Sequence, residues 1–333
     1  MAGLETEGLA NHPVVEVLLA TFNGGRFLRE QIDSILAQDY TNLRILARDD
    51  GSSDETGEIL NEYAERLPNR FRTMPSSRGT GNPKDNFLLL MRASTAQYIC
   101  FSDQDDVWLP DKVSKTMRSM NQLLSRWGDS TPLLVFTDLH VVDSQLRMIH
   151  ESFWKHERID PGCIDRLTRL LGQNVVTGCT AMLNRRLLDI SLDMPEGAHM
   201  HDRWIGLLAS AMGKAGIVRS QTVLYRQHDR NVFGAEKQTG LLPDLARRMR
   251  NGGGRELQWE ISQRQAAALL QVHRTELTEK NRNILTAYLR CGTSRSRFVR
   301  IGTLIRYGFF RVGMMRNVAT LIHLWTMKVD DVD

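Results

Sequence analysis

The sequence has few cysteines and no long apolar run. Its four cysteines lie far apart and form no CxxC pair: Cys100, Cys163, Cys179 and Cys291. This spacing argues against a zinc site or a disulfide framework and favours a reducing compartment. No stretch reaches eighteen apolar residues, so no conventional membrane span is expected. The first thirteen residues lack the basic and apolar parts of a secretory signal, and we expect a cytoplasmic protein.

The strongest pattern in the chain is an alternation of strands and helices. Short apolar runs that end in turn residues predict strands over 14–20, 43–49, 71–74, 97–102, 133–136, 181–183 and 216–218. Helical spacing of apolar residues predicts helices over 26–39, 56–66, 83–93, 255–280 and 298–327. Strands that alternate with helices predict an α/β fold with a mostly parallel central sheet flanked by helices, followed by a helical extension.

The change in this pattern predicts three regions. We expect residues 1–13 to form a flexible tail and residues 14–233 to form the α/β domain. Residues 234–333 would form a basic helical region. A chain of 333 residues with 41% apolar content has room for one large domain and such an appendage.

Polar clusters follow three of the predicted strands, at residues 21–26, 49–54 and 103–106. Ligands of parallel sheets bind beyond the carboxyl ends of the strands. These clusters are therefore expected to meet in one site.

The acidic run from Asp103 to Asp106 is the clearest candidate for a metal site. Carboxylates at i and i+2 after a buried strand can share a divalent cation, and hard oxygen ligands suit Mg²⁺ or Mn²⁺. A bound diphosphate would complete the coordination. The alternative is an acidic turn that caps the following helix. In the cluster after the second strand, Asp50 can accept hydrogen bonds from a base or ribose, whereas Ser53 and Asp54 are better explained as helix caps.

Four segments together resemble the family 2 glycosyltransferases of the Rossmann-like GT-A fold: 17–28, 34–38, 49–56 and 101–112. Residues 102–108 and 225–228 are similar to the bacterial rhamnosyltransferase-like branch. The resemblance extends from about residue 14 to residue 233. It implies transfer of a sugar from a nucleoside-diphosphate donor.

The resemblance also assigns roles to individual residues. Donor contacts are implied for Thr21, Asn23, Arg26, Asp50, Asn86, Asp103 and Gln104. Asp105 would be the direct metal ligand, with His228 as a late histidine that contacts metal or diphosphate. Thr177, Gly178 and Trp204 would border the acceptor or the transferred sugar. A solvated helix face explains Lys84, which is close to Asn86 in the chain, as well as donor contact does.

Asp202 is the candidate general base. Inverting transfer needs one base that removes the proton of the acceptor hydroxyl. A carboxylate that opens a helix is equally typical of an N-cap, and the family resemblance favours the base. The family often has Glu where this chain has His201, which leaves the base role with Asp202. A lone histidine such as His228 is usually structural, and Arg226 beside it could steady phosphate charge.

The C-terminal region combines basic and apolar residues. Between residues 281 and 328 the chain has no Asp or Glu but nine Arg and Lys. Such a segment suits a helix on an anionic membrane surface, at the inner face of the cytoplasmic membrane. Packing on the catalytic domain is the alternative, and we favour the membrane slightly. No nucleic-acid-binding motif accompanies the charge, so nucleic acid is not expected as a partner.

Taken together, the sequence predicts an inverting, metal-dependent glycosyltransferase. The preferred donor is dTDP-L-rhamnose, with a UDP-sugar as the other candidate. The preferred acceptor is a hydroxyl of a lipid-linked or growing cell-surface polysaccharide. The alternatives are a nucleotidyltransferase acting on sugar phosphates and a non-catalytic sugar-nucleotide-binding protein. A nucleotidyltransferase would need a Gly-rich basic loop after the first strand, and residues 21–26 are a poor version of one.

Overall fold

The computed structural model describes residues 12–75, 79–228 and 252–327. The first half contains β1 (Val15–Thr21), α1 (Gly25–Leu36), β2 (Leu43–Asp49), α2 (Thr56–Arg66), β3 (Phe71–Thr73), α3 (Pro83–Ala93), β4 (Tyr98–Ser102), β5 (Val107–Trp108) and α4 (Lys112–Trp127). It is followed by β6 (Leu133–Asp143), β7 (Met148–His150), α5 (Phe153–His156), η1 (Pro161–Asp165), α6 (Leu167–Leu170), η2 (Gly178–Thr180), β8 (Met182–Asn184), α7 (Arg185–Ser191), α8 (His201–Met212) and β9 (Lys214–Gln227). Four helices complete the described chain: α10 (Gly252–Val272), α11 (Glu279–Thr293), α12 (Arg297–Tyr307) and α13 (Met314–Thr326).

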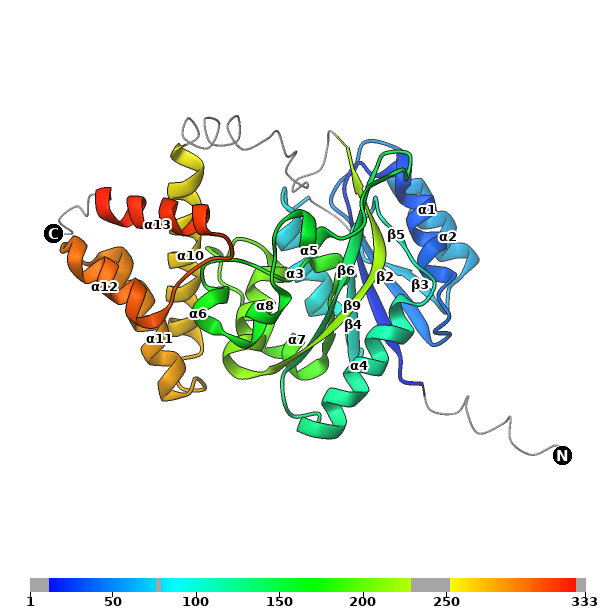
Figure 1. The fold of residues 1–333 in the computed structure, drawn as a ribbon. Helices are drawn as coiled ribbons and strands as arrows, with labels where there is room; N and C mark the ends of the chain where they lie inside the picture. Colours follow the sequence, from blue (N-terminus) through cyan, green and yellow to red (C-terminus); the bar gives the residue numbers. More distant parts are fainter. Residues whose placement is uncertain (1–11, 76–78, 229–251, 328–333) are drawn as a thin grey trace.

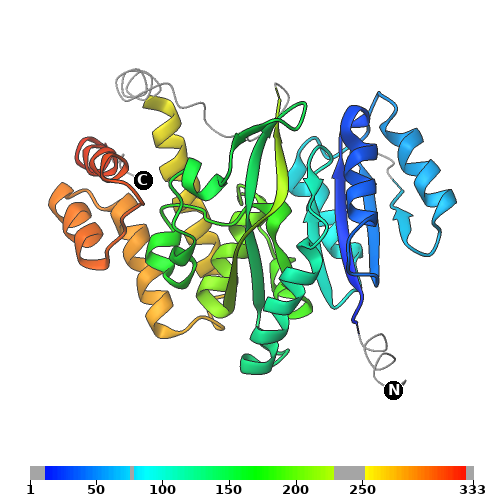
Figure 2. The ribbon, with the colours of Figure 1, turned by 45° about the vertical axis from the view of Figure 1, so that its right-hand side comes forward.

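The strands form one mixed, mostly parallel sheet in the order β3-β2-β1-β4-β8-β6-β9-β5, with β7 beside β6. The neighbours β3, β2, β1 and β4 are parallel, whereas β8 is antiparallel to both β4 and β6. The sheet stands between two groups of helices, with α1 and α2 on one side and α7 and α8 on the other (Figures 1 and 2). This arrangement confirms the predicted GT-A-like fold class.

Strand β1 shows why the sheet is buried on both faces. Val17 and Leu19 belong to the core that contains residues of α1, α2 and α4. Leu18, between them, belongs to the second core, which is built from α3, α7 and α8. Alternate residues of a strand point to opposite faces, so an unbroken apolar run is the pattern expected of a strand covered twice.

Strands β6 and β9 are longer than the sequence predicts. The apolar run of β6 ends at Phe136, but the strand continues through Asp138 to residue 143. The buried Asp138 carboxylate accepts hydrogen bonds from Ser152 Oγ at 2.5 Å and Gln221 Nε2 at 3.0 Å. These partners come from distant parts of the chain, so a polar residue that interrupts the apolar pattern still lies inside the strand.

The C-terminal helices pack on the same domain, on the side of the sheet away from α1 and α2 (Figure 2). Their buried side chains, including Leu269, Tyr288 and Leu324, join the core cluster that contains α8. The prediction of one continuous helix over 298–327 is wrong, because Gly308 (φ +67°) and Gly313 (φ +99°) separate α12 from α13. None of the helices in the described residues has the length and apolar character needed to cross a membrane.

Two predicted boundaries lie outside the described residues. The flexible tail falls almost entirely on residues 1–11, and the domain boundary at 233/234 falls between residues 228 and 252. Both stay predictions.

Candidate functional site

The loops that follow β1, β2 and β4 meet at one edge of the sheet. Strand β1 is parallel to both neighbours, with Thr21 beside Asp49 and Leu19 beside Ser102. The carboxyl ends of β1, β2 and β4 therefore lie at the same edge of the sheet. The sequence-based expectation that the three polar clusters lie together agrees with this register.

The first two loops are joined by hydrogen bonds. The Asn23 main-chain N–H donates to Ser52 Oγ at 2.8 Å, and Asn23 Oδ1 accepts from Ser53 N at 2.8 Å. Thr21 Oγ1 donates to Asp49 Oδ1 at 3.0 Å. In this structure Thr21 and Asn23 thus shape the loops that a donor would contact. The guanidinium of Arg26 lies outside this network, exposed and 4.7 Å from the centre of the Phe27 ring.

The Asp50 carboxylate is fully hydrogen-bonded within the protein. One oxygen accepts from Arg48 Nη1 at 2.7 Å and Thr80 N at 2.7 Å, and the other accepts from Thr80 Oγ1 at 2.9 Å and Gly81 N at 2.9 Å. Burial opposes ionisation of Asp50, but these hydrogen bonds outweigh it and lower its pKa. A carboxylate accepts about four hydrogen bonds. Contact between Asp50 and a nucleotide would therefore require Thr80 or Gly81 to release one of them.

Asn86 lies beneath these loops. Its side chain is buried, its Oδ1 accepts from Arg48 Nη1 at 2.8 Å, and its Nδ2 donates to the main-chain oxygens of Arg48 and Thr21. Asn86 therefore connects the ends of β1 and β2. The nearby Lys84 ammonium donates to the Glu196 main-chain oxygen at 2.7 Å.

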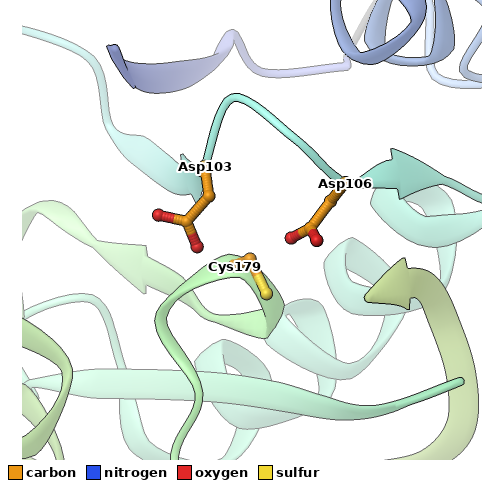
Figure 3. Close-up of side chains that lie close together, drawn as sticks. All are labelled: Asp103, Asp106 and Cys179. Atoms are coloured by element: carbon orange, nitrogen blue, oxygen red, sulfur yellow. The ribbon is translucent and has the colours of Figure 1, made fainter. Parts of the chain in front are cut away.

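Within the acidic run, Asp103 and Asp106 lie close to one another and to Cys179 (Figure 3). One carboxylate oxygen of each and the Cys179 sulfur all lie within 4.8 Å of one another. Asp106 is 0% exposed. Its Oδ1 accepts from Arg226 N at 3.1 Å, while its Oδ2 has no partner in the described chain apart from the neighbouring Cys179 thiol. The structure thus brings together an acidic pair and a thiol that the sequence does not associate.

Asp105 has a different partner. Its Oδ2 lies 2.9 Å from Nε2 of His228, whose ring also stacks on Phe27 at 5.2 Å between ring centres. The two residues that the family resemblance assigns to the metal are therefore in direct contact. Arg226, in contrast, is buried and donates to Glu30, to the Asp105 main-chain oxygen and to the Ser144 main-chain oxygen. These hydrogen bonds join the acidic loop to β9. They also occupy the Arg226 guanidinium, which the sequence suggests as a contact for phosphate.

The electrostatics of the site favour binding of a cation. Burial, followed by repulsion from Asp105 and Asp202, raises the pKa of Asp103 to about 7. Burial and the charges of Asp105 and Asp103 raise the pKa of Asp106 well above its ordinary value. A divalent ion would relieve both effects. The two carboxylates suit Mg²⁺ or Mn²⁺, whereas the soft Cys179 sulfur suits neither, so the oxygens are the fitting donors.

Asp202 opens α8 opposite the acidic run. Its Oδ1 accepts from Arg203 N at 2.5 Å, and the Gly178 main chain and the Asn174 side chain also donate to its carboxylate. Burial raises the pKa of Asp202 to about 6, although these hydrogen bonds oppose the shift. The charge of Asp202 contributes to the raised pKa of Asp103, so the two carboxylates interact electrostatically.

Gly178 must be a glycine because His201 packs directly on it. A Cβ at residue 178 would lie 2.8 Å from His201 Nε2 and 3.7 Å from Asp202 Cβ. The partly buried Thr177 precedes it and caps the η2 turn with its main-chain oxygen. His201 lies between the rings of Phe87 and Phe101, and neither ring nitrogen has a hydrogen-bond partner among the described residues. Burial lowers the pKa of His201 to about 3, so the ring is neutral.

Trp204 is buried. Its side chain is 0% exposed and lies in the core with Ile205 and Leu208. Contact with an acceptor or a transferred sugar would require this packing to open, and the assignment of Trp204 to the acceptor side stays a prediction. Helix α8 is buried around most of its circumference, between the sheet and the C-terminal helices, so Trp204 faces protein rather than an open cleft.

Sequence reasoning missed Cys179 and Lys112. Lys112 is fully buried, its ammonium lies 4.0 Å from the Trp108 ring centre, and it finds no hydrogen-bond acceptor in the described structure. Burial lowers its pKa, which the nearby Cys100, Cys179 and Asp106 partly oppose. One signal was available, since a lysine in the first turn of α4 opposes the helix dipole. Cys179 carried no signal, because only folding brings it beneath the acidic run.

The described residues combine a GT-A-like fold with an acidic run at the edge of the sheet where β1, β2 and β4 end. Residues 16–128 match the family described as "Glycosyl transferase family 2". The dTDP-rhamnosyl transferase RfbG of Shigella flexneri is 27% identical over 228 residues, which cover 65% of this chain and 74% of that protein.

Two solved structures share the fold. S. aureus TarS 1-349 in complex with UDP-GlcNAc has a TM-score of 0.56 at 15% identity, covering 94% of this chain and 89% of that one. The mannosyltransferase PcManGT from Pyrobaculum calidifontis, in complex with GDP-Man and Mn²⁺, has a TM-score of 0.50 at 16% identity, covering 94% of this chain and 79% of that one. The match over residues 16–128 agrees with the predicted resemblance, and the fold prediction is confirmed.

Proposed function

We propose that the protein is a metal-dependent, inverting glycosyltransferase that uses a nucleoside-diphosphate sugar. The preferred donor is dTDP-L-rhamnose, and the preferred acceptor is a hydroxyl of a lipid-linked or growing cell-surface polysaccharide. The observation that carries the proposal is that the Asp202 carboxylate packs against Gly178, whose neighbour Cys179 lies within 4.8 Å of Asp103 and Asp106 in the acidic run. The raised pKa of Asp202 supports it. One base and one cation site are what inverting transfer requires.

The donor assignment rests on related proteins. The name of the RfbG relative supports dTDP-rhamnose, while the TarS and PcManGT structures contain UDP-GlcNAc and GDP-Man. A nucleotide-sugar donor is the feature common to all three. The family match favours sugar transfer over nucleotidyl transfer and over simple binding.

In the proposed reaction the Asp202 carboxylate takes the proton of the acceptor hydroxyl. The acceptor oxygen forms a bond to the anomeric carbon, and the bond from that carbon to the diphosphate breaks on the opposite face. The bonding electrons leave with the nucleoside diphosphate. The buried setting of Asp202 keeps its proton affinity high enough for a general base near neutral pH.

Asp103, Asp105 and Asp106 are the residues that would hold Mg²⁺ or Mn²⁺, with His228 beside Asp105. The buried Asp106 Oδ2, without a partner other than the Cys179 thiol among the described residues, fits a role as a ligand. When bound, the ion would neutralise charge on the leaving diphosphate. Gln104 and the loops around Thr21 and Asn23 would orient the nucleotide.

A donor panel tests the proposal. The purified protein would be heated with dTDP-rhamnose, UDP-GlcNAc or GDP-mannose, with and without Mn²⁺ or Mg²⁺, and its Tm measured. A ligand of the folded state raises Tm with its concentration. We expect the largest metal-dependent shift with dTDP-rhamnose, followed by release of dTDP when an acceptor is added. Absence of both binding and turnover with every donor would remove the proposal.

A further inference from the structure

Helices α12 and α13 expose an unusual number of large apolar side chains. They lie at the end of the molecule farthest from α1 and α2 (Figure 1). Seven large apolar residues of these helices are exposed: Phe298, Ile305, Met314, Met315, Val318, Ile322 and Trp325. We call this set the α12–α13 surface. Phe298 is 70% exposed and Trp325 45% exposed. Exposed apolar clusters of this kind mark sites of interaction.

The apolar residues form ordered stripes rather than scattered points. On α13, Met314, Val318, Ile322 and Trp325 follow one another at spacings of four, four and three residues. Such spacing places them on one face of a helix. On α12, Phe298 and Ile305 are seven residues apart and also share a face. The rings of Phe298 and Trp325 meet edge to face at 5.6 Å, which joins the two stripes.

Arginines border the apolar stripes. The guanidinium of Arg297 lies 4.5 Å from the Trp325 ring centre and 5.8 Å from that of Phe298. Arg306 follows Ile305 and is exposed. Residues 281–328 contain no Asp or Glu, and the next acidic residues in the sequence are Asp330, Asp331 and Asp333. The cluster of Arg297, Phe298 and Trp325 therefore offers an apolar body and a cationic edge, the combination suited to a lipid headgroup boundary.

The opposite faces of the same helices are anchored. Leu304, Phe309 and Leu324 are buried in the core that includes α8. The Arg169 guanidinium donates to the Phe310 main-chain oxygen at 3.0 Å, and Arg316 donates to the Glu157 main-chain oxygen at 3.0 Å. Packing on the catalytic domain thus accounts for the inner faces of α12 and α13, while the apolar stripes remain on the outside. Packing on the catalytic domain and contact with a membrane surface are therefore compatible for the basic C-terminal region.

We propose that the α12–α13 surface docks the protein onto an anionic lipid membrane. The helices would lie along the surface, since the thirteen residues of α13 span only about 20 Å against a hydrocarbon core of about 30 Å. A second copy of the chain is a poorer occupant, because a two-fold contact through this surface would bring Arg297 and Arg306 of both copies together. This proposal does not depend on the donor site or on the metal site.

Vesicle binding tests the inference. The full-length protein would be sedimented with vesicles of phosphatidylcholine alone or with added phosphatidylglycerol. We expect binding to the anionic vesicles, weakened by salt. In Phe298→Ser/Trp325→Ser the partition coefficient should fall about tenfold or more, and in Arg297→Gln/Arg306→Gln by about fivefold for each charge lost.

Trp127 provides a matched control. It is 40% exposed on α4 and lies close to two cations, Arg126 at 5.1 Å and Lys214 at 4.6 Å from its ring centre. Trp127→Ser should bind anionic vesicles as the wild type does. Asp202→Asn should also bind normally, so a failure of the proposed chemistry and a failure of membrane docking are distinguishable.

Tryptophan quenching by brominated lipids gives an independent reading. If Trp325 enters the headgroup boundary, quenching should fall in Trp325→Phe and persist in Trp127→Phe. No binding to anionic vesicles, or equal binding by the Phe298→Ser/Trp325→Ser and Trp127→Ser variants, would overturn the inference. A concentration-dependent dimer that the α12–α13 variants abolish, without vesicle binding, would assign the surface to a second copy instead.

Discussion

The side-chain amide of Gln104 forms two hydrogen bonds with the main chain of Phe22. Its Oε1 accepts from Phe22 N at 2.7 Å, and its Nε2 donates to the Phe22 oxygen at 2.9 Å. A Cβ on Gly24 would lie 2.3 Å from the same Gln104 Oε1, so the loop has room for this amide only with glycine at that position. The acidic run and the loop after β1 are therefore fixed to each other. Both polar ends of Gln104 are occupied, which makes it a positioning residue in this structure.

Replacing Gln104 by Met should weaken donor binding. Methionine keeps the length of the side chain but removes both hydrogen bonds to Phe22. Two hydrogen bonds contribute about 1 kcal/mol each, so we expect the Kd for the donor to rise by up to about thirtyfold, with a smaller change in kcat. Titration calorimetry in the presence of Mn²⁺ measures the effect. Gln122→Met, on the exposed surface of α4, is the control. An unchanged Kd would show that the amide does not organise the donor site.

Asp105→Asn should abolish the metal-dependent part of donor binding. The substitution keeps the shape of the side chain and removes the charge that would bind the cation beside His228. The expected result is a Tm shift with donor that no longer responds to Mn²⁺ or Mg²⁺. Asp111→Asn, which removes a surface carboxylate paired with Lys115, should leave the response intact. If the Tm shift of Asp105→Asn with donor still responded fully to metal, Asp103 and Asp106 rather than Asp105 would be the metal ligands.

Asp202→Asn should preserve donor binding and lose turnover. Loss of a general base lowers kcat by about 10²- to 10⁴-fold, whereas the donor contacts lie elsewhere. Asp193→Asn, an exposed carboxylate nearby in the chain, is the matched control. Unchanged turnover in Asp202→Asn would leave this residue with a structural role at the start of α8.

The same base predicts the pH dependence of the wild-type enzyme. With a pKa of about 6, Asp202 is ionised and active above that pH and protonated below it. We expect kcat/KM to fall on the acidic side of pH 6, about tenfold for each further pH unit. A pH–rate profile at fixed metal concentration measures this limb. A limb near pH 4, the ordinary range of a carboxylate, would contradict the environment described for Asp202.

His201→Leu should make the protein less sensitive to acid. The folded-state pKa of His201 is lowered to about 3 from an ordinary 6.5, because its ring is buried between Phe87 and Phe101. The unfolded chain therefore binds the extra proton between these values, and stability falls as the pH drops below about 6.5. At pH 5 this effect is about 2 kcal/mol. Denaturant unfolding at pH 7.5 and pH 5 should show a smaller difference in the variant, and an equal difference would be contrary to the prediction.

A double-mutant cycle at Lys112 and Asp106 should reveal coupling between the two buried residues. Lys112→Met removes a buried cation whose neighbours include the Asp106 carboxylate. Either single substitution removes the electrostatic interaction between Lys112 and Asp106, and the double variant loses it only once, so its cost should be less than the sum. We expect a coupling of at least about 1 kcal/mol in the free energy of unfolding. Additive effects of Lys112→Met and Asp106→Asn would mean that the two groups stabilise the fold independently.

Much of the fold was predictable because its information is local. Apolar runs such as Val17–Ala20 of β1 and the helical spacing of α2 and α3 appear in a few consecutive residues, and turn residues mark their ends. The same local signals placed the three polar clusters at one edge of the sheet. These signals failed where a residue's secondary structure depends on a partner that is distant in the sequence. Asp138 continues β6 because Ser152 and Gln221 satisfy its carboxylate.

The sequence by itself determined the alternating architecture and the residue types at the candidate site. Only the tertiary structure decided what each side chain does. Asp50 and Gln104 are occupied by protein partners, Trp204 is in the core, and Cys179 lies beneath Asp103 and Asp106. The physical reason is that a motif specifies which groups are available in the chain. Burial and hydrogen-bond saturation depend on residues from many elements, and these decide which groups remain open to a ligand.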